Sequence, residues 1–464
     1  MGRSNSRNNS KNNLKQPAKQ TETVKSLSEE VKVTEKTVVK PEKAVYTGPI
    51  LEKRESENKP LALIETLWFA EDYGSLIDAY ALDKAVQSFG WDTAIMNKPC
   101  ELCTEDDEET ETEKVSAAFI AKYSTLAKKA STKEQLEAAA KSADAVIVGT
   151  GDVWNYEKIT KYTKNHYYLD YVHEDKKRFS YGSSFGTSYT GPFGEDIKSS
   201  ARNLRRFDAL SVNNFDNLEM ARDYFGVDAE VVADPIFICG NKCLEAIAAN
   251  AACKADEQKD DTFIVSYIKN PDPRKAQLVL KGNEILTPNN YSPLRNLADI
   301  KTASELTAEK TKDEKKTILK TVTDIIEGYV EDKKEKTEED TCFGLTPAKI
   351  SAVEDWLYYI LNSEFLITDD YPAVCLALSF NKPFVFVESK NNDETENVSA
   401  LLSQLGLEER IVCTEDDFKS KEYLFRMPIR YNKVNKVLDS IKKQSYEWLA
   451  ARLEVKSDKS DVEE

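Results

Sequence analysis

Two neighbouring carboxylates, Asp369 and Asp370, directly follow a short apolar run at residues 365–368. The run predicts a buried strand, and ligands in open α/β sheets bind outside the carboxyl ends of strands. We therefore expect Thr368, Asp369 and Asp370 to face a ligand. The two carboxylates could carry a transfer reaction, with or without a divalent cation. The alternative is that they only cap the helix that follows.

A second group of polar residues follows another predicted strand, at residues 143–148. The next stretch is rich in glycine and contains Gly149, Gly151 and Asp152, with Asn155 shortly after them. Glycines let a ligand approach the backbone, while the carboxylate and the amide supply polar contacts at a strand end. We therefore add Asp152 to the catalytic candidates, and to the substrate-binding candidates Gly149, Gly151 and Asn155.

Small residues follow a third predicted strand, which begins near Arg178. The loop after it contains Ser183 and Ser184, whose hydroxyl groups could line a cradle for a sugar or a phosphate. The alternative is an ordinary turn made of small residues. Both serines are candidates for substrate binding.

The elements that must position these residues alternate between strand and helix. The order is clearest at residues 61–96, where a strand, a turn, an amphipathic helix and a second strand follow one another. This order is typical of a Rossmann-type βαβ unit. Its turn lacks the GxGxxG pattern, so the sequence does not support a dinucleotide cofactor. We expect an α/β protein that uses no cofactor.

Changes in composition predict the domain boundaries. We expect two Rossmann-like domains, a disordered polar N-terminal tail with a basic beginning, and further polar segments. The ranges are 1–59 for the tail, 60–245 for the N-terminal domain with an acidic loop at 101–114, 260–431 for the C-terminal domain with a charged insert at 302–341, 432–453 for a final helix and 454–464 for a polar tail. The N-terminal tail could tether the protein to an anionic partner.

The composition excludes several classes of function. The chain has 464 residues and a formal net charge of −17, which disfavours non-specific binding to nucleic acid. No apolar run is long enough to span a membrane, and we expect a soluble, cytoplasmic protein. Eight scattered cysteines suit reduced thiols. With one CxxC pair, at Cys100 and Cys103, and two histidines in the chain, we expect no zinc site, and we name no metal ligands.

Four stretches, in this order and spacing, resemble the motifs of the polysaccharide pyruvyl transferase family. The likeness covers residues 61–453. The stretches are DYGSL at 72–76 with AYAL at 79–82, DAVIVGTGDVWN at 144–155, the series FSYGSSFG at 179–186 with FDALSV at 207–212 and ADP at 233–235, and LITDDYPAVCLALSFNKPF at 366–384. Each motif alone is weak, but the series of four is fairly specific.

The resemblance implies a fold and a reaction. Members of this family have a GT-B-like fold, in which two Rossmann-like domains face a cleft. They transfer pyruvate from phosphoenolpyruvate to a sugar of a glycan, so both molecules are the implied partners. The positions in the matching motifs complete the substrate-binding candidates with Tyr73, Gly74, Ser75, Asn213 and Lys382.

The sequence departs from the family pattern at positions that carry charge. Pro372 stands where the family has a histidine, and Asn213 stands where it has an arginine. Asp370 replaces a serine and adds a negative charge that would repel an anionic donor. Other basic residues could substitute for the missing groups, and the sequence offers Arg178, Arg205, Arg206 and Lys382.

Three hypotheses follow from these observations. The first is an active pyruvyl transferase, and the second is a non-catalytic descendant that keeps the fold as a binding or scaffold protein. The third is a different carbohydrate-related transferase that uses Asp152, Asp369 and Asp370.

Overall fold

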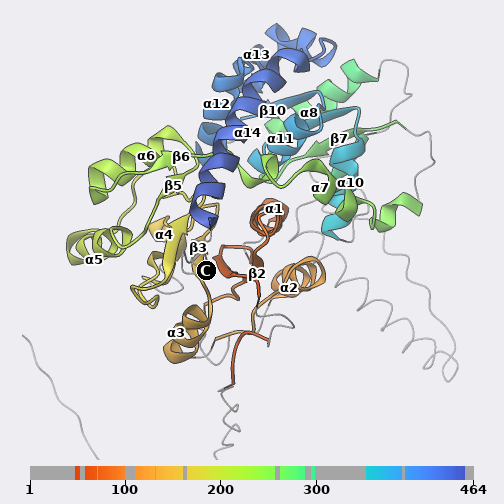
Figure 1. Ribbon diagram of the computed structural model, residues 1–464. Coiled ribbons are helices and arrows are strands. Elements are labelled where there is room, and N and C mark those ends of the chain that lie inside the picture. The colour runs from red at the N-terminus through yellow and green to blue at the C-terminus, as the bar shows by residue number, and fades with distance from the viewer. Residues whose placement is uncertain are drawn as a thin grey trace, which may run out of the picture. The chain divides into compact units, whose positions relative to one another are not determined.

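The computed structural model describes two regions rich in parallel strands and the helices around them (Figure 1). The described residues are 48–52, 58–69, 72–99, 110–130, 132–159, 165–255, 262–287, 294–297, 352–388 and 392–454. Several expectations lie outside these residues. They are most of the N-terminal tail with its predicted partner, most of the acidic loop, the CxxC pair, the charged insert and most of the C-terminal tail.

The first sheet has four parallel strands in the order β2-β1-β3-β4. They are β1 Leu61–Glu65, β2 Asp92–Ile95, β3 Ala145–Val148 and β4 Lys177–Ser180, with helices α1 Tyr73–Gln87, α2 Glu111–Tyr123 and α3 Lys133–Ser142 between them. β1 and β3 are wholly buried, as expected for central strands of a sheet covered on both faces. The expected βαβ opening is therefore present.

Short elements lie on both sides of β4 in the sequence, the first two before it and the others after it. They are α4 Tyr156–Ile159, η1 His166–Tyr168, α5 Gly194–Leu204, β5 Ser211–Val212, α6 Phe215–Met220, the π-helical turn η2 Ala221–Phe225, β6 Glu230–Val231, η3 Pro235–Phe237, α7 Asn241–Ala248 and η4 Ala252–Ala255. β5 and β6 form a separate parallel pair. A bridge between Ser183 and Val212 links this pair to the loop after β4.

The second sheet has five parallel strands in the order β11-β10-β9-β7-β8. The strands are β7 Ile264–Tyr267, β8 Leu294–Leu297, β9 Phe365–Thr368, β10 Phe384–Val387 and β11 Ile411–Val412. The other elements are α8 Pro273–Leu286, α10 Val353–Asn362, α11 Tyr371–Ser379, α12 Asn392–Leu405, η6 Glu408–Arg410, α13 Glu415–Ser420 and η7 Glu422–Phe425. The parallel sheets confirm the predicted α/β class with two Rossmann-like units.

The last helix, α14 Tyr431–Leu453, returns to the first half of the chain (Figure 1). Trp91 Nε1 donates a hydrogen bond to the Leu453 carbonyl at 2.9 Å, and Ser445 Oγ accepts one from the Ala233 amide at 2.7 Å. Trp448 packs edge-on against Phe179 of β4. The end of the sequence therefore helps to fix the loop at residues 232–234.

Two expected boundaries differ from the structure. Residues 48–52 were expected in the disordered tail, but Ile50 is buried and its carbonyl accepts a hydrogen bond from the Lys128 amide at 2.7 Å. The apolar pair Ile50-Leu51 supplies the surface that packs there. α2 begins at Glu111, inside the expected acidic loop, because Thr110 and Glu113 form a capping box. Among the described residues, no helix is long and apolar enough to cross a membrane.

A buried ion pair fixes the loop after β7. Lys275 Nζ lies 2.5 Å from Asp369 Oδ2, and both side chains are almost fully buried. Asp369 also accepts hydrogen bonds from the backbone amides of Lys269 and Asn270, at 2.6 and 3.2 Å. The carboxylate after β9 therefore holds the loop that carries Lys269.

We predict that Lys275→Met lowers the free energy of unfolding by about 3–5 kcal/mol, because it leaves the buried Asp369 charge uncompensated. Chemical denaturation monitored by circular dichroism measures the change. Lys281 on the same helix supplies the control, since its 3.2 Å pair with Glu415 is exposed. Lys281→Met should change stability by less than about 1 kcal/mol. Equal losses in both variants would contradict this account.

Candidate functional site

A cavity of about 150 Å³ lies where residues from both halves of the chain meet. Its walls include three side chains of the α1 region, two of the α11 start and several loop residues. The lining residues are Thr66, Leu67, Asp72, Ser75, Asp78, Thr150, Gly151, Asp152, Lys158, Gly182, Asn213, Val232, Ala233, Asp234, Lys269, Tyr371, Pro372 and Asn397. The cavity thus lies beyond the carboxyl ends of β1, β3, β7 and β9.

Two aspartates in the cavity favour their protonated forms. Burial raises the pKa of Asp78 well above its usual range, and the negative charges of neighbouring carboxylates, Asp234 first, raise it further. Burial also raises the pKa of Asp234 to about 7, although a hydrogen bond from the Ile236 amide opposes the shift. Near neutral pH this pair therefore holds at least one proton that it can give up, as a general acid must.

The surroundings of Asp78 favour its protonated form. Its Oδ2 accepts a hydrogen bond from Thr150 at 3.3 Å, while its buried Oδ1 has no hydrogen-bond partner within the described part of the chain. An ionised carboxylate would lose much more free energy there than a neutral carboxyl group. Asp78 is therefore a carboxyl group directed into a site where a ligand could complete its hydrogen bonds.

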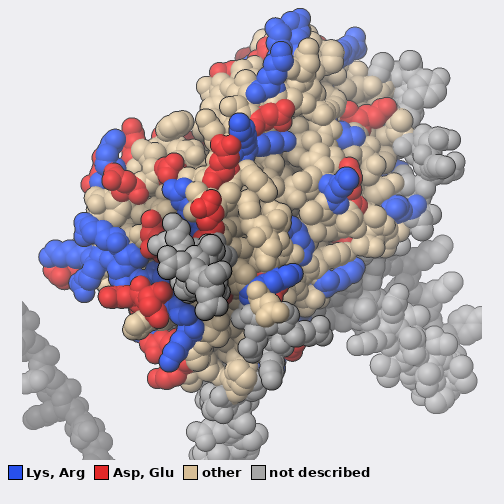
Figure 2. Space-filling view, viewed as in Figure 1, with Lys and Arg blue, Asp and Glu red and all other residues tan. Residues whose placement is uncertain are grey.

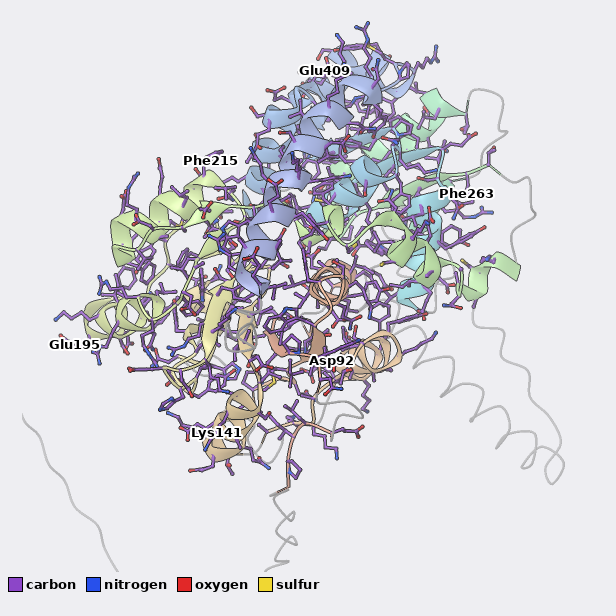
Figure 3. All side chains as sticks on the ribbon, viewed as in Figure 1. Asp92, Lys141, Glu195, Phe215, Phe263 and Glu409 are labelled. Atoms are coloured by element: carbon purple, nitrogen blue, oxygen red, sulfur yellow. The ribbon has the colours of Figure 1, made fainter. Side chains whose placement is uncertain are left out.

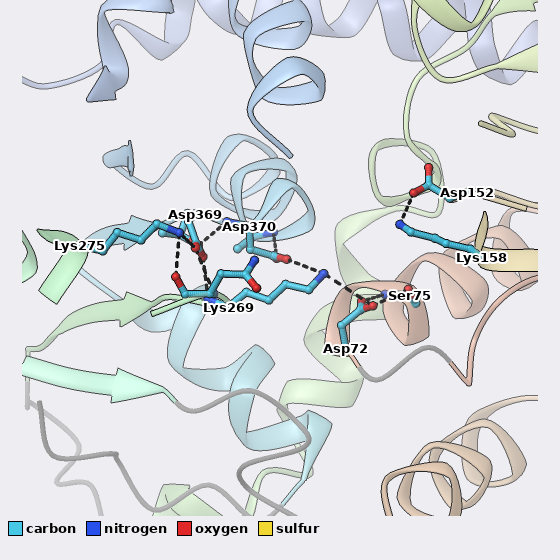
Figure 4. Close-up of polar contacts among 11 residues, drawn as sticks. Asp72, Ser75, Asp152, Lys158, Lys269, Lys275, Asp369 and Asp370 are labelled. Carbon is cyan, nitrogen blue, oxygen red and sulfur yellow. Dashed lines mark hydrogen bonds and ion pairs between the residues drawn. The ribbon is translucent and has the colours of Figure 1, made fainter. Parts of the chain in front are cut away.

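Lys269 brings a positive charge to the same cavity (Figure 4). Its Nζ lies 3.7 Å from Asp72 Oδ2 and 3.9 Å from Asp370 Oδ1. Burial would raise the pKa of Asp72, but the charge of Lys269 and two hydrogen bonds from Ser75 lower it, so Asp72 is ionised. Asp72 and Asp370 cap α1 and α11, and Lys269 lies between these two helix starts.

Lys158 brings a second positive charge, from α4. Its Nζ forms an ion pair with Asp152 Oδ2, and Asp152 Oδ1 accepts a hydrogen bond from Ser184 at 2.8 Å. The side chain of Lys158 is half exposed and that of Asp152 is largely buried. The ammonium group can therefore move between Asp152 and a ligand at low cost.

The predicted residues after β9 have different places. Asp370 caps α11 by accepting a hydrogen bond from the Ala373 amide, as the alternative interpretation held. Thr368 Oγ1 accepts a hydrogen bond from the Asp370 amide. Asp369 is wholly buried in its pair with Lys275 and is not among the lining residues. The carboxylate of Asp369 holds the β7 loop, and its catalytic role stays a prediction.

Of the predicted substrate-binding residues, the cavity lining includes Ser75, Gly151 and Asn213, with Asp152 from the catalytic candidates. Others support the walls from behind. Ser183 Oγ donates to backbone carbonyls of Val148 and Gly149, and Asn155 caps α4 by accepting from the Lys158 amide.

Two glycines and a tyrosine lie behind the cavity walls and pack closely against neighbouring side chains. A Cβ atom at Gly74 would overlap the ring of Pro372, and one at Gly149 would overlap the Thr66 side chain. Tyr73 is buried, and its ring stacks on Trp356 with centroids 5.3 Å apart. These residues shape the cavity without lining it.

The basic residues proposed as substitutes lie elsewhere. Lys382 precedes β10 and is therefore at the opposite edge of the sheet from Thr368, where Glu364 lies near it. Lys382 is not among the residues that line the cavity, and its role in substrate binding stays a prediction. Arg178, Arg205 and Arg206 each donate a hydrogen bond to a backbone carbonyl, of His173, Phe225 and Val172 respectively.

Neither histidine lines the cavity. His166 is buried against Glu65 at 3.0 Å, and His173 is exposed beside Asp175. Among the described residues, no three His, Cys, Asp or Glu side chains are grouped so that they could hold a metal ion. The arrangement thus offers lysines and carboxyl groups for chemistry.

Sequence analysis missed Asp78, Asp234, Lys158 and Lys269 as site residues. Asp234 lies near the end of the stretch EVVADP at 230–235 and in the family motif ADP at 233–235, so the signal was present. Lys269 directly follows the strand expected at 262–268, which is the same signal that singled out Asp369. Asp78 interrupts the apolar face of a helix, and such a residue is easily taken for a surface charge.

A sequence profile of the family described as Polysaccharide pyruvyl transferase matches residues 79–391. The chain belongs to this family. It is therefore a member of a group of glycan-modifying transferases, and the predicted family is confirmed. The match begins one residue after Asp78 and includes Lys158, Asp234 and Lys269, so most of the lining residues lie within the family's own region. A search of curated proteins gave no match to the chain.

Solved structures that resemble the chain include two sugar-nucleotide enzymes. One is a UDP-GlcNAc 2-epimerase from Neisseria meningitidis bound to UDP-GlcNAc, with a TM-score of 0.46 and 11% identity, covering 85% of this chain and 99% of the other. Another is a putative UDP-N-acetylglucosamine 2-epimerase from Listeria monocytogenes, with a TM-score of 0.46 and 12% identity, covering 85% and 95%.

We predict that Asp234→Asn removes a pH-dependent loss of stability. Folding raises the pKa of Asp234 from 3.8 to about 7, so the neutral form of Asp234 stabilises the fold. This contribution is fully present below about pH 4. That contribution is lost as the pH rises through about 7. The melting temperature of the variant minus that of the parent should therefore rise between about pH 4 and 7 and then level off.

Differential scanning fluorimetry across this pH range measures the difference. Asp416→Asn is the control, because Asp416 is an exposed carboxylate on α13. If the Asp234→Asn difference is flat across the range, the carboxyl group of Asp234 is not shifted by the fold.

Proposed function

We propose that this protein transfers pyruvate from phosphoenolpyruvate to a sugar of a glycan, with lysines and a protonated aspartate pair in place of the family's arginine and histidine. The observation that supports this is the presence of Lys158, Lys269, Asp78 and Asp234 in the walls of one cavity. The reaction needs cations for the donor and a proton for its methylene carbon. Phosphoenolpyruvate is a cytoplasmic metabolite, so the proposal also places the protein in the cytoplasm.

The two lysines would bind the anionic groups of the donor. Lys269 lies in the cavity wall, 3.7 Å from Asp72 and 3.9 Å from Asp370, so its charge is placed to meet a phosphate or a carboxylate there. Lys158 is half exposed and can do the same from the opposite wall. Asp72 and Asp152 remain nearby and oppose an anion, so we expect weaker donor binding than fixed arginines would give.

The Asp78–Asp234 pair would move the protons. A protonated member of the pair gives its proton to the methylene carbon of the donor, which becomes a methyl group. One sugar hydroxyl forms a bond to the adjacent carbon and returns its proton to the pair. A second hydroxyl then forms a bond to the same carbon while the bond to phosphate breaks, and the released phosphate takes the second hydroxyl proton. The pair thus ends in its starting protonation state.

The residues that stand in place of the family's histidine and arginine, Pro372 and Asn213, make structural contacts in this chain. Pro372 packs against Gly74, which brings the starts of α11 and α1 together. Asn213 and its neighbour Asn214 donate hydrogen bonds to Asn397 of α12, at 3.4 and 2.7 Å. These contacts link the two halves beside the cavity, and they also fit the second candidate, a non-catalytic descendant that binds a glycan.

We predict that phosphoenolpyruvate binds the full chain and that Lys269→Met weakens this binding by about tenfold to a hundredfold, because a charged contact to the donor is lost. Isothermal titration calorimetry near pH 6.5 measures the affinity. Lys281→Met, which removes an exposed lysine of α8, should leave the affinity unchanged.

A specific result would instead support the non-catalytic candidate. In that case the parent gives no binding heat, and Pro372→His combined with Asn213→Arg creates binding. Such a result would show that the two lysines do not replace the family's residues.

We predict a pH dependence of the transfer reaction. The rate should fall as the pH rises through about 7, because Asp234 then ionises and the pair holds one proton fewer. Ionisation also adds a negative charge to the cavity and so weakens donor binding. Asp78→Asn and Asp234→Asn should each lower kcat by about a hundredfold or more.

Phosphate release with a glycan acceptor measures the rate. The exposed variant Asp416→Asn should keep the parent's rate and pH profile. If Asp234→Asn retains full kcat, another group must deliver the proton.

A further inference from the structure

An aromatic cluster lies on the outside of the first half of the chain. Phe193 at the start of α5 and Tyr224 in η2 are among the most exposed large rings, with exposed fractions of 65% and 48%. The ring of Tyr189 stacks on that of Tyr224 with centroids 3.7 Å apart and meets that of Phe193 edge-on at 5.6 Å. We call Tyr189, Phe193 and Tyr224 the aromatic surface.

The aromatic surface is held in place before any ligand arrives. Tyr189 donates a hydrogen bond to the Pro192 carbonyl at 2.5 Å, which fixes its hydroxyl end. Its ring also meets Phe225, which stacks on the buried Phe185 with centroids 4.8 Å apart. Rings that are already ordered lose little conformational entropy when a ligand binds, so this arrangement favours recognition.

Helix α4 contacts both the cavity and the segment that carries the aromatic surface. Tyr156 of this helix packs against Gly191, where an added Cβ would lie 2.9 Å from the tyrosine ring. Its hydroxyl donates a hydrogen bond to Asp196 of α5 at 3.1 Å. Lys158 of the same short helix lines the cavity. Because one short helix contacts both regions, a chain-like molecule in the cavity would need to pass only this helix to reach the aromatic surface.

Charged groups of both signs lie beside the rings. Arg222 and Asp223, which precede Tyr224, form an exposed ion pair at 2.8 Å, and Glu195 pairs with Lys198 on α5 at 2.7 Å. Figure 3 labels Glu195 on this outer helix, and Figure 2 shows Lys and Arg side chains gathered over the same region with acidic groups among them.

This combination fits a sugar chain. A sugar ring has an apolar C–H face that can stack on an aromatic ring and a rim of hydroxyl groups that need polar partners. A lipid surface would need a continuous apolar patch, and a nucleic acid would need uniformly positive charge. We propose that the aromatic surface binds the chain of the acceptor glycan beyond the sugar that enters the cavity. The proposal rests on the proposed function for the identity of that acceptor.

A glycan array identifies the tetrasaccharide that binds the full chain most strongly. Calorimetry then compares the affinity of the protein for this tetrasaccharide with its affinity for the disaccharide that forms the terminal end of the tetrasaccharide. The tetrasaccharide should bind more tightly, because only the longer chain reaches the aromatic surface. Phe193→Ala and Tyr224→Ala should each weaken tetrasaccharide binding by about twofold to tenfold and leave the affinities for the disaccharide and for phosphoenolpyruvate unchanged.

Tyr423→Ala is the matched control, since Tyr423 of η7 is 49% exposed and lies outside the aromatic surface. Its tetrasaccharide affinity should equal that of the parent. Absence of binding to every glycan of the array, or equal losses in Tyr423→Ala, would overturn the proposal. It would also be overturned if Phe193→Ala converts a dimer to a monomer in light scattering, because a second copy would then cover the aromatic surface. If phosphoenolpyruvate does not bind but Phe193→Ala still weakens tetrasaccharide binding, the proposed donor is wrong, while the proposed role of the aromatic surface is supported.

Discussion

The contact between Gly74 and Pro372 decides where the two halves of the chain meet. A side chain at Gly74 would overlap the proline ring, so glycine is the residue that lets the starts of α1 and α11 approach each other. Each helix start carries an aspartate cap, Asp72 or Asp370, and Lys269 lies between the two carboxylates. The cavity, its charges and its access all depend on this close approach, since separated helix starts would leave these charges in water.

The electrostatics of the cavity follow from its burial. Carboxylates that would ionise on the surface lose hydration here, and Asp78 and Asp234 respond by keeping protons. Asp72 faces the same loss of hydration, but Lys269 and the hydrogen bonds of a helix start keep it ionised. Similar side chains therefore take different charge states within one cavity, and this difference is what an acid–base reaction requires.

The residues at the two motif positions where the resemblance implies a histidine and an arginine make structural contacts. Pro372 shapes the contact with α1, and Asn213 joins a polar link to Asn397. The cations of the cavity come instead from the loop after β7 and from α4. The lysine of the β7 loop depends on a second, deeper interaction, because the buried Asp369–Lys275 pair holds the backbone beneath it. A residue that looks catalytic by its place in the sequence thus acts on the site by supporting a neighbour.

The sequence by itself determined the α/β class, the family, and the strand ends near which the site lies. Apolar runs followed by polar residues at 148–152 and 368–370 are local patterns, and parallel strands place such ends at one edge of a sheet. The sequence could not show that Asp152 lines the cavity whereas Asp369 is buried in an ion pair, because both residues follow the end of a strand. Only the tertiary structure decided which charges share a cavity and which protons they keep. Those properties depend on burial and on distances between residues far apart in the chain, such as Asp78 and Asp234.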